Sequence, residues 1–268
     1  FVFFTYLYPP TFFGLPQVAE KSILVPMAHD EPPLYLGIFR SLFHLPRGFI
    51  FNTDEERRFV HETFRNDYLP WTVCGAGIHI PPSSPPAPPG GDYFLYLGRV
   101  DVEKGCGELI DFFQRHKKKH PSDIKLYLAG DVNMAVPKGG DIVPLGFISA
   151  RSKTTVLANA SALIVPSRHE SLSLVALEAW AAGVPVITQP QTAAGLESGH
   201  QRGVAVAETA EEWVQTIVEL LSDSKASKNL ALKGSEIWSK TYSPERVRQS
   251  IRDAISLVLK TRVPARMS

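Results

Sequence analysis

From residue 93 onward, short apolar runs alternate with segments of helical periodicity. The apolar runs contain four to seven residues each and occupy residues 93–98, 124–130, 141–147, 162–165 and 184–188. Helical periodicity occupies residues 107–119, 152–159 and 173–182. Unbroken apolar runs of this length, separated by helices, are typical of parallel strands that are buried on both faces. The pattern therefore predicts a doubly wound α/β domain, in which ligands bind outside the carboxyl ends of the strands.

A proline-rich stretch precedes this pattern. Residues 81–91 (PPSSPPAPPGG) contain six prolines and two glycines, a composition that supports neither a helix nor a central strand. We interpret the stretch as an extended linker, and the alternative is a long surface loop inside one domain. The expected parts are a first domain (1–80), the linker (81–91), a second domain (92–242) and a carboxyl-terminal helix (243–268) that could cross back to the first domain.

The region before the linker predicts a smaller domain with strands and helices. A strand is expected over residues 22–27, another within GFIFNT, and a capped helix over 54–64. The opening run FVFFTYLY is cut by Pro9 and Pro10, so it is too short to span a membrane. We interpret this run as a buried strand that lacks its beginning, and the chain as a fragment whose first domain is incomplete.

Composition excludes several classes of function. The chain has 268 residues, is 44% hydrophobic and has a formal net charge of +1, so a strongly basic surface for nucleic acid is not expected. The dense basic cluster at residues 116–120 falls at a predicted helix end, where a solvated face is favoured over a binding patch. The two cysteines, Cys74 and Cys106, suggest neither a disulfide framework nor a metal site, which favours a reducing, cytoplasmic compartment.

The loop after the first strand of the second domain, GRVDVEKG, carries two cations. Gly98 and Gly105 allow the loop to turn tightly, and Arg99 and Lys104 would reach over the carboxyl edge of the predicted sheet. Two cations in this place could neutralise a diphosphate, whose charge rises as a glycosidic bond to it breaks. The alternative is an ordinary charged surface, because this pattern is common in proteins.

A second motif, VPSRHESLSLVALEAWAAGVPVIT, places two carboxylates around a helix start. Glu170 lies in the loop after the strand 162–165, and Glu178 lies within the helix 173–182. The helix N-terminus between them offers free backbone N–H groups and a positive dipole end, which suit a phosphate. Carboxylates on either side of an anion site suit a ligand whose hydroxyl groups flank a diphosphate, and a nucleotide sugar is such a ligand.

Together, GRVDVEKG and PSRHESLSLVALEAWAAGVPVI resemble the carboxyl-terminal half of retaining GT-B glycosyltransferases of glycosyltransferase family 4. The resemblance is specific over residues 93–188 and looser elsewhere. It implies two Rossmann-like doubly wound domains whose parallel sheets face a cleft, the first domain being incomplete here. It also implies that the second domain holds most of a UDP-, GDP- or ADP-sugar donor.

The resemblance assigns roles to individual residues. Arg99 and Lys104 would bind the donor diphosphate. Glu170 would face the hydroxyl groups of the transferred sugar, and Glu178 those of the ribose. The other donor-binding positions, which would meet the distal phosphate and the base, are Gly98, Phe147, Ile148, Ser171, Leu172, Ser173 and Leu174.

Two positions carry an open alternative. His29 follows the strand 22–27 and would point into the cleft near the donor sugar, or it could be a structural histidine in a surface turn. Ser173 stands where many relatives have glycine, so it could act as an N-cap while the approach of the backbone to phosphate becomes less close.

The sequence therefore predicts an enzyme that transfers a sugar to an acceptor hydroxyl with retention of configuration, without an essential metal or another cofactor. The alternatives are an epimerase or phosphorylase with a similar cleft, and a fragment that binds nucleotide sugars with an impaired site. The acceptor, whether glycan, lipid or small molecule, is unknown. Neither a transmembrane segment nor a nucleic-acid partner is expected, and peripheral contact with a membrane acceptor stays open.

Overall fold

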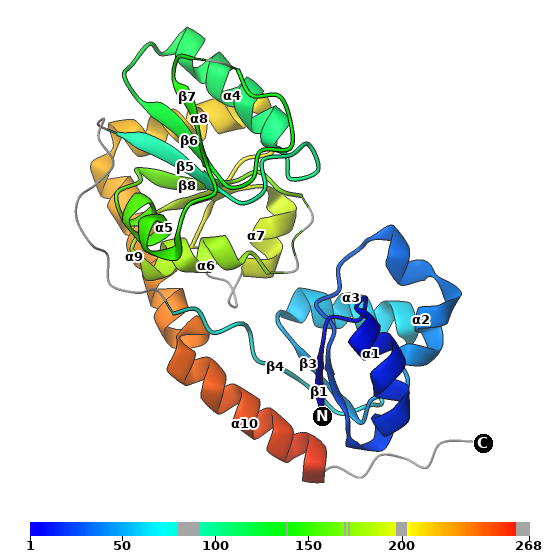
Figure 1. Cartoon of the computed structure of the whole chain (residues 1–268). Coiled ribbons are helices and arrows are strands. Elements are labelled where there is room, and N and C mark those ends of the chain that lie inside the picture. Colours follow the sequence, from blue (N-terminus) through cyan, green and yellow to red (C-terminus); the bar gives the residue numbers. More distant parts are fainter. Residues whose placement is uncertain (80–91, 138, 169, 171, 197–202, 261–268) are drawn as a thin grey trace. The chain divides into compact units, whose positions relative to one another are not determined.

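The computed structural model describes residues 1–79, 92–137, 139–168, 170, 172–196 and 203–260 (Figure 1). The chain divides into two compact units, of which unit 1 combines Phe1–Gly77 with Pro244–Ser268 and unit 2 is Ile78–Ser243. Each unit is built on its own parallel sheet. The expected linker, residues 81–91, lies outside the described residues.

Unit 2 contains a six-stranded sheet in which all neighbouring strands are parallel. Its strands are β5 (Tyr93–Leu97), β6 (Lys125–Ala129), β7 (Ile142–Gly146), β8 (Ala162–Val165), β9 (Val186–Thr188) and β10 (Ala205–Val206). The spatial order is β7-β6-β5-β8-β9-β10, so the chain builds from β5 toward one edge and then from β8 toward the other. This order is that of a Rossmann-like doubly wound sheet, and the α/β fold predicted from the apolar runs is confirmed.

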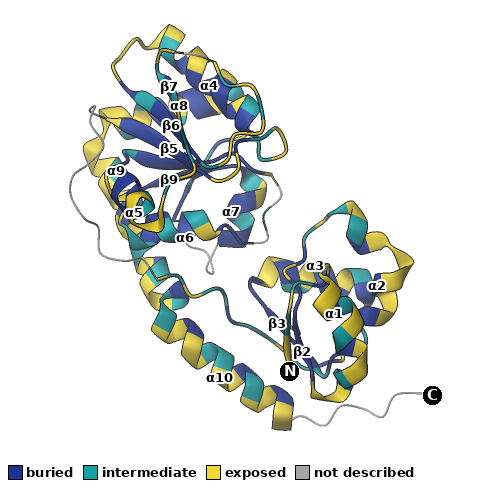
Figure 2. Cartoon of the chain, in the orientation of Figure 1, coloured by how far each residue is buried: buried dark blue, intermediate teal, exposed yellow. Residues whose placement is uncertain are grey.

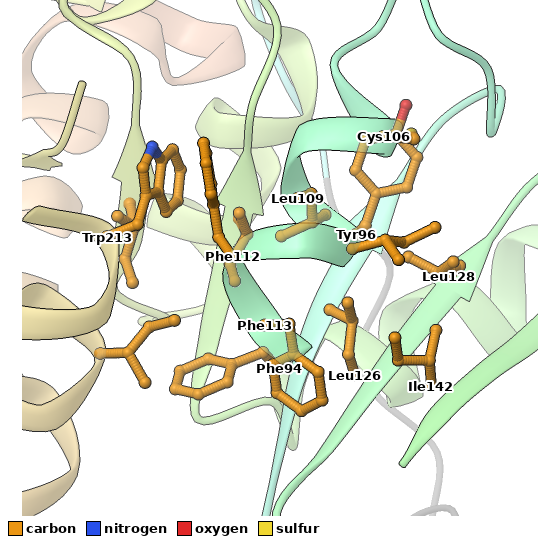
Figure 3. Close-up of a cluster of buried hydrophobic side chains, with 14 of the residues drawn as sticks. Phe94, Tyr96, Cys106, Leu109, Phe112, Phe113, Leu126, Leu128, Ile142 and Trp213 are labelled. Atoms are coloured by element: carbon orange, nitrogen blue, oxygen red, sulfur yellow. The ribbon is translucent and has the colours of Figure 1, made fainter. Parts of the chain in front are cut away.

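Helices cover both faces of this sheet (Figure 1). They are α4 (Cys106–Lys119), α5 (Ala150–Ala158), α6 (Leu174–Ala181), α7 (Pro190–Leu196), α8 (Ala210–Ser222) and α9 (Ser224–Ile237), and a π-helical turn (Trp238–Tyr242) follows. On one face, Phe113 of α4 and Trp213 of α8 belong to the same buried cluster as Phe94 of β5 (Figure 3). On the other face, the Tyr93 hydroxyl donates to the Val156 carbonyl of α5 at 2.6 Å. The central strands are therefore buried on both sides (Figure 2).

Unit 1 contains a four-stranded parallel sheet in the order β1-β2-β3-β4. Its strands are β1 (Val2–Phe4), β2 (Ile23–Val25), β3 (Gly48–Phe51) and β4 (Trp71–Val73). Its α-helices are α1 (Pro9–Gly14), α2 (Gly37–Leu42), α3 (Asp54–Phe64) and α10 (Pro244–Lys260), and two 3₁₀-helices cover Leu15–Lys21 and Pro32–Tyr35.

Each face of the unit 1 sheet packs against helices. On one face, Ala254 and Val258 of α10 share a buried cluster with Ile50 of β3. The Arg47 side chain before β3 donates to the Val258 carbonyl at 3.0 Å, which fixes the end of α10 to this sheet. On the opposite face, the core contains Phe43 just after α2, whose ring stacks on Phe64 of α3 with centroids 4.0 Å apart.

The opening segment differs from the prediction. The run FVFFTYLY was expected to form a buried strand, but β1 is an edge strand whose last residue, Phe4, is 61% exposed, and Phe1 before it is 71% exposed. The expectation of burial is wrong because β1 pairs with β2 alone, so its other edge has no partner strand among the described residues of unit 1. Pro9 and Pro10 do not simply interrupt the run. They occupy the first turn of α1, where a missing N–H group costs nothing.

Candidate functional site

Between β5 and β8, the direction in which the chain adds strands to the unit 2 sheet reverses. These two strands are neighbours, but β6 follows β5 on one side and β9 follows β8 on the other. Loops that leave such a pair of strands turn away from each other, and the crevice between them is the usual ligand site of doubly wound sheets. Both sequence motifs, GRVDVEKG and the glutamate motif, begin at this edge.

Two glycines let the loops at this edge approach each other closely. Gly105 precedes α4 with φ 76°, and a Cβ atom there would lie 2.6 Å from the Pro166 carbonyl oxygen of the loop after β8. Gly130 follows β6 with φ 143°, and a Cβ atom there would lie 1.9 Å from the Gly98 carbonyl oxygen. Side chains are excluded at both contacts, so the close approach requires glycine.

The loop that carries Arg99 is held by its own side chains. The buried Tyr96 hydroxyl donates to the Arg99 carbonyl at 2.6 Å, and burial raises the pKa of Tyr96, which keeps the hydroxyl group protonated as a donor. The Asp101 carboxylate accepts from the Lys104 backbone N–H at 2.8 Å and lies 3.6 Å from the Arg99 guanidinium. The Arg99 side chain itself is 58% exposed, so its charge is available to a ligand.

The structure brings Lys104 and Glu170 together. The Lys104 Nζ lies 2.9 Å from the Glu170 Oε1, although the two residues are 66 positions apart in the sequence. Their side chains are 33% and 24% exposed, so a ligand can reach the pair. The site thus contains a guanidinium group and an ion pair whose lysine and carboxylate could each be offered to a ligand.

The second glutamate of the motif lies in α6. Its Oε1 accepts a hydrogen bond from Lys153 Nζ of α5 at 2.5 Å. The Glu178 Oε2 is buried and has no hydrogen-bond partner in the described part of the chain. Glu170 and Glu178 therefore each bind a lysine. Lys104 lies in the loop between β5 and α4, whereas Lys153 lies in α5.

The helix start between the glutamates is formed partly as expected. Ser173 occupies the N-cap position of α6, but its side chain makes no capping bond and its buried hydroxyl group has no partner among the described residues. A serine N-cap bond at this position is therefore not formed. Leu172 is buried and Leu174 is 43% exposed, whereas Ser171 lies outside the described residues.

The segment expected to hold the base follows β7. Phe147 is 81% exposed and Ile148 is half-buried. Because all strands of the sheet are parallel, this segment emerges at the same edge as the loops after β5 and β8. Ser149 then caps α5 by accepting the Ser152 backbone N–H at 3.1 Å, so the segment leads directly into the helix of Lys153.

His29 belongs to unit 1 and follows β2. Its Nε2 lies 3.5 Å from the Glu31 Oε2, and its side chain is 32% exposed. The other Glu31 oxygen accepts a hydrogen bond from the Tyr6 hydroxyl at 2.7 Å. Burial, aided by this bond, raises the pKa of Tyr6, so the phenol remains a donor. His29 is therefore oriented by a fixed carboxylate and is open to a ligand.

Sequence reasoning assigned no site role to Glu56, which is central to unit 1. Thr53 caps α3 by accepting the Glu56 backbone N–H at 3.0 Å, as the capped helix start predicted. The Glu56 carboxylate is 2% exposed and accepts backbone N–H groups from Ala28 at 2.7 Å and Asn52 at 2.8 Å. It thereby joins the His29 loop to the loop after β3. The spacing Thr53-x-x-Glu56 was the signal that could have found it.

Burial also changes the titration of this carboxyl group. Loss of water around Glu56 raises its pKa to about 7, and the backbone N–H bonds only partly oppose that rise. Lys153 was missed as well, and no sequence signal marks it, because one lysine in a helix is indistinguishable from a surface lysine.

Within the described residues, no group of three or more His, Cys, Asp or Glu side chains could hold a metal ion. Nor does that part of the chain contain a helix long and apolar enough to cross a membrane.

A family model and several curated proteins match parts of the chain. Residues 91–223 match the family model described as "Glycosyl transferases group 1". Glycogen synthase of Mycobacterium tuberculosis (strain H37Rv) is 34% identical over 103 residues, which cover 35% of this chain and 25% of that protein. The chain thus spans about a quarter of the length of this curated relative.

Solved structures match nearly the whole chain. Sucrose-phosphate synthase of Thermosynechococcus elongatus superposes with a TM-score of 0.76 at 16% identity, covering 96% of this chain and 73% of the synthase. HepE of Anabaena, solved in complex with UDP, superposes with a TM-score of 0.73 at 14% identity, covering 95% of this chain and 78% of HepE. At such low identity these similarities establish the fold alone, which is that of GT-B glycosyltransferases. The chain therefore has the GT-B fold, and its residues 91–223 match the model of the group 1 glycosyltransferases.

Proposed function

We propose that this chain is part of a retaining glycosyltransferase of family 4, which transfers a sugar from a nucleoside diphosphate to an acceptor hydroxyl. The observation that carries the proposal is the ion pair of Lys104 and Glu170, 2.9 Å long, at the switch point of the sheet. Its lysine stands in the loop that also carries Arg99. It lies inside the segment that matches the group 1 family. The UDP bound by a protein of the same fold supports a nucleotide donor.

Each part of the donor is assigned to different residues at the carboxyl edge of the unit 2 sheet. Arg99 and Lys104 bind the diphosphate, and Glu170, released from Lys104, accepts hydroxyl groups of the transferred sugar. The N-terminus of α6 faces the distal phosphate with its free N–H groups. Glu178 accepts ribose hydroxyl groups, and the exposed segment of Phe147 and Ile148 meets the base.

Transfer in this proposal requires no covalent intermediate. The acceptor oxygen forms a bond to the anomeric carbon on the face that the diphosphate leaves. The bond from that carbon to the phosphate oxygen breaks, and the phosphate oxygen takes the acceptor proton. Negative charge grows on the diphosphate as the bond breaks, so the cations of Arg99 and Lys104 stabilise the transition state more than the ground state.

Those two cations would serve in place of a divalent metal, so we propose metal-independent transfer without another cofactor. His29 is proposed to contact the transferred sugar, on the basis of the family resemblance. We place the reaction in the cytoplasm, where nucleotide sugars are made.

The test begins with binding. Calorimetric titration of the chain with UDP, GDP and ADP identifies the base, and the matching nucleotide sugars are then tested as donors. Arg99→Ala and Lys104→Ala are each expected to slow sugar transfer by roughly 10²-fold or more, because each removes a pre-organised charge from the transition state. Activity within a few-fold of the parent in both variants would contradict the proposal.

Two other results would point elsewhere. A free epimer of the donor sugar, formed without any acceptor, would identify a nucleotide-sugar epimerase. Nucleotide binding without turnover of any nucleotide sugar would identify a binding fragment with an impaired site. The length of the chain relative to the curated glycogen synthase makes that control necessary.

A further inference from the structure

The contact between Lys153 and Glu178 is not explained by the family motifs. Lys153 lies in the second turn of α5, and Glu178 lies in α6, 25 residues later. The ammonium group of Lys153 approaches the Glu178 Oε1 to 2.5 Å, and the side chains are 36% and 17% exposed. The contact therefore sits at a partly open position between two helices that start at the same edge of the sheet.

The two oxygens of Glu178 differ in their access to a ligand. Oε2 is buried and lacks a hydrogen-bond partner within the described residues, so a ligand can reach the carboxylate only through Oε1. A carboxylate oxygen offers about two acceptor positions. Lys153 occupies one of them at Oε1. One position is therefore left for a hydroxyl group, and its direction is set by where the lysine stands.

The same contact also compensates a cost. Burying a carboxylate oxygen without a hydrogen-bond partner is unfavourable. Burying the whole carboxylate without a positive partner would be still more unfavourable. A lysine on the neighbouring oxygen keeps the carboxylate in place despite that cost. Without this lysine, Glu178 would be expected to turn toward water, which would move Oε1 away from its present position.

The position of α5 links this pair to the nucleotide. Helix α5 starts directly after the segment of Phe147 and Ile148, which is proposed to meet the base. Lys153 thus lies on the helix that connects the base segment to the carboxylate proposed to meet the ribose. A second lysine–carboxylate pair in the same unit, Lys117 with Asp141 at 2.9 Å, lies at the far end of α4 and is unrelated to this edge.

We infer that Lys153 is a positioning residue, which holds Glu178 by Oε1 so that the remaining acceptor position receives a ribose hydroxyl group of the donor. The inference rests on the proposed function, because it takes the ligand of Glu178 to be a nucleotide. It makes the site selective for ribonucleoside diphosphates over forms that lack the ribose hydroxyl groups. Lys153 itself does not need to touch the nucleotide.

The test compares nucleotides with and without those hydroxyl groups. The nucleoside diphosphate that binds the parent chain and its 2′,3′-dideoxy form are titrated against the parent, Lys153→Met and Lys117→Met. For Lys153→Met, the dissociation constant of the ribonucleotide is expected to rise roughly tenfold, about the effect of losing one hydrogen bond to a charged group. The constant for the dideoxy form should change less than about threefold. Lys117→Met should leave both constants unchanged, and Lys153→Arg should restore most of the ribonucleotide affinity.

Each remaining outcome decides against a specific claim. Equal losses for both nucleotides would overturn the inference, because they would show a general structural or phosphate-binding role. Unchanged or tighter ribonucleotide binding by Lys153→Met would also overturn it. If the parent binds none of UDP, GDP and ADP, the proposed function fails and the inference fails with it. Hydrogen exchange of the α5 and α6 amides monitors folding, and Lys153→Gln replaces Lys153→Met if the latter does not fold.

Discussion

The two units stabilise their carboxylates at the sheet edge in opposite ways. In unit 1, the Glu56 carboxylate is buried and bound by backbone N–H groups of Ala28 and Asn52. In unit 2, Glu170 and Glu178 are partly exposed, and each is bound by one lysine side chain. A backbone N–H group cannot move away without disrupting the loop that carries it, whereas a lysine side chain has several rotatable bonds.

This difference separates structural carboxylates from those that can serve a ligand. Glu56 satisfies donors that would otherwise be buried and unpaired, so it is expected to stabilise unit 1 whether or not a ligand is bound. The pair of Lys104 and Glu170 lies at the switch point, where hydroxyl groups or phosphates of a ligand can replace one partner, and the partly exposed Glu178 keeps an acceptor position open beside Lys153. Their main contribution is therefore expected in binding and not in stability.

The largest effect on stability is expected for Glu56→Gln. At pH 5 the Glu56 carboxyl group is protonated in the folded chain, but both of its oxygens can still accept a hydrogen bond. A glutamine amide turns an –NH₂ group toward one of the two backbone N–H donors, so at least one donor is left buried and unpaired. The free energy of unfolding of unit 1 should fall by about 3 kcal/mol at pH 5. Native-state hydrogen exchange of the β2 and β3 amides measures it, because these amides report on unit 1 alone.

A matched control lies on the same helix. Glu62 of α3 is exposed, so Glu62→Gln should change the hydrogen exchange of β2 and β3 very little. Equal effects of Glu56→Gln and Glu62→Gln would remove the distinction drawn between the two kinds of carboxylate.

A somewhat smaller effect is expected when pH is varied. Burial raises the pKa of Glu56 from 4.5 to about 7, so the folded chain binds a proton more tightly than the unfolded chain. The contribution of Glu56 to stability is therefore complete below pH 4.5 and is lost as the pH rises through 7. The parent should lose about 2 kcal/mol relative to Glu56→Gln between pH 5 and pH 8.

The same hydrogen-exchange measurement, repeated at several pH values, provides the test. Because the comparison is between the parent and one variant, the other titrating groups of unit 1 largely cancel. If the parent instead became more stable relative to Glu56→Gln as the pH rises, the backbone N–H bonds, and not burial, would control the pKa of Glu56.

The sequence predicted unit 2 better than unit 1, for a physical reason. Strand β8 was predicted at its observed bounds, because apolar runs in a sheet covered on both faces contrast clearly with the helices around them. Helices α1 and α2 were not predicted, since each has only six residues and too few turns for a helical period to show. The opening run was assigned to a buried strand because hydrophobic composition does not distinguish an edge strand from a central one.

The same reasoning applies to the candidate site. Lys104 and Glu170 could be paired from the sequence because each stands in a motif at the end of a strand, and parallel strands bring such loops to one edge. Lys153 lies inside a helix, where only the packing of α5 beside α6 shows which residue its side chain meets. Motifs in the sequence therefore identify the residues in the loops of this site. They do not identify a helix side chain such as Lys153, which contacts a site residue.

The smallest effect on stability is expected for Glu170→Gln. The pair with Lys104 is partly exposed, and pairs of this kind contribute at most about 1 kcal/mol to folding, so the hydrogen exchange of β5 and β8 should hardly change. Sugar transfer should nevertheless fall by roughly 10²-fold, because glutamine provides no charge opposite the sugar. Glu108→Gln, which breaks the more exposed pair with Arg168, should change neither quantity. A loss of unit 2 stability in Glu170→Gln as large as that of unit 1 in Glu56→Gln would mean that lysine-bound carboxylates are as structural as those bound by the backbone.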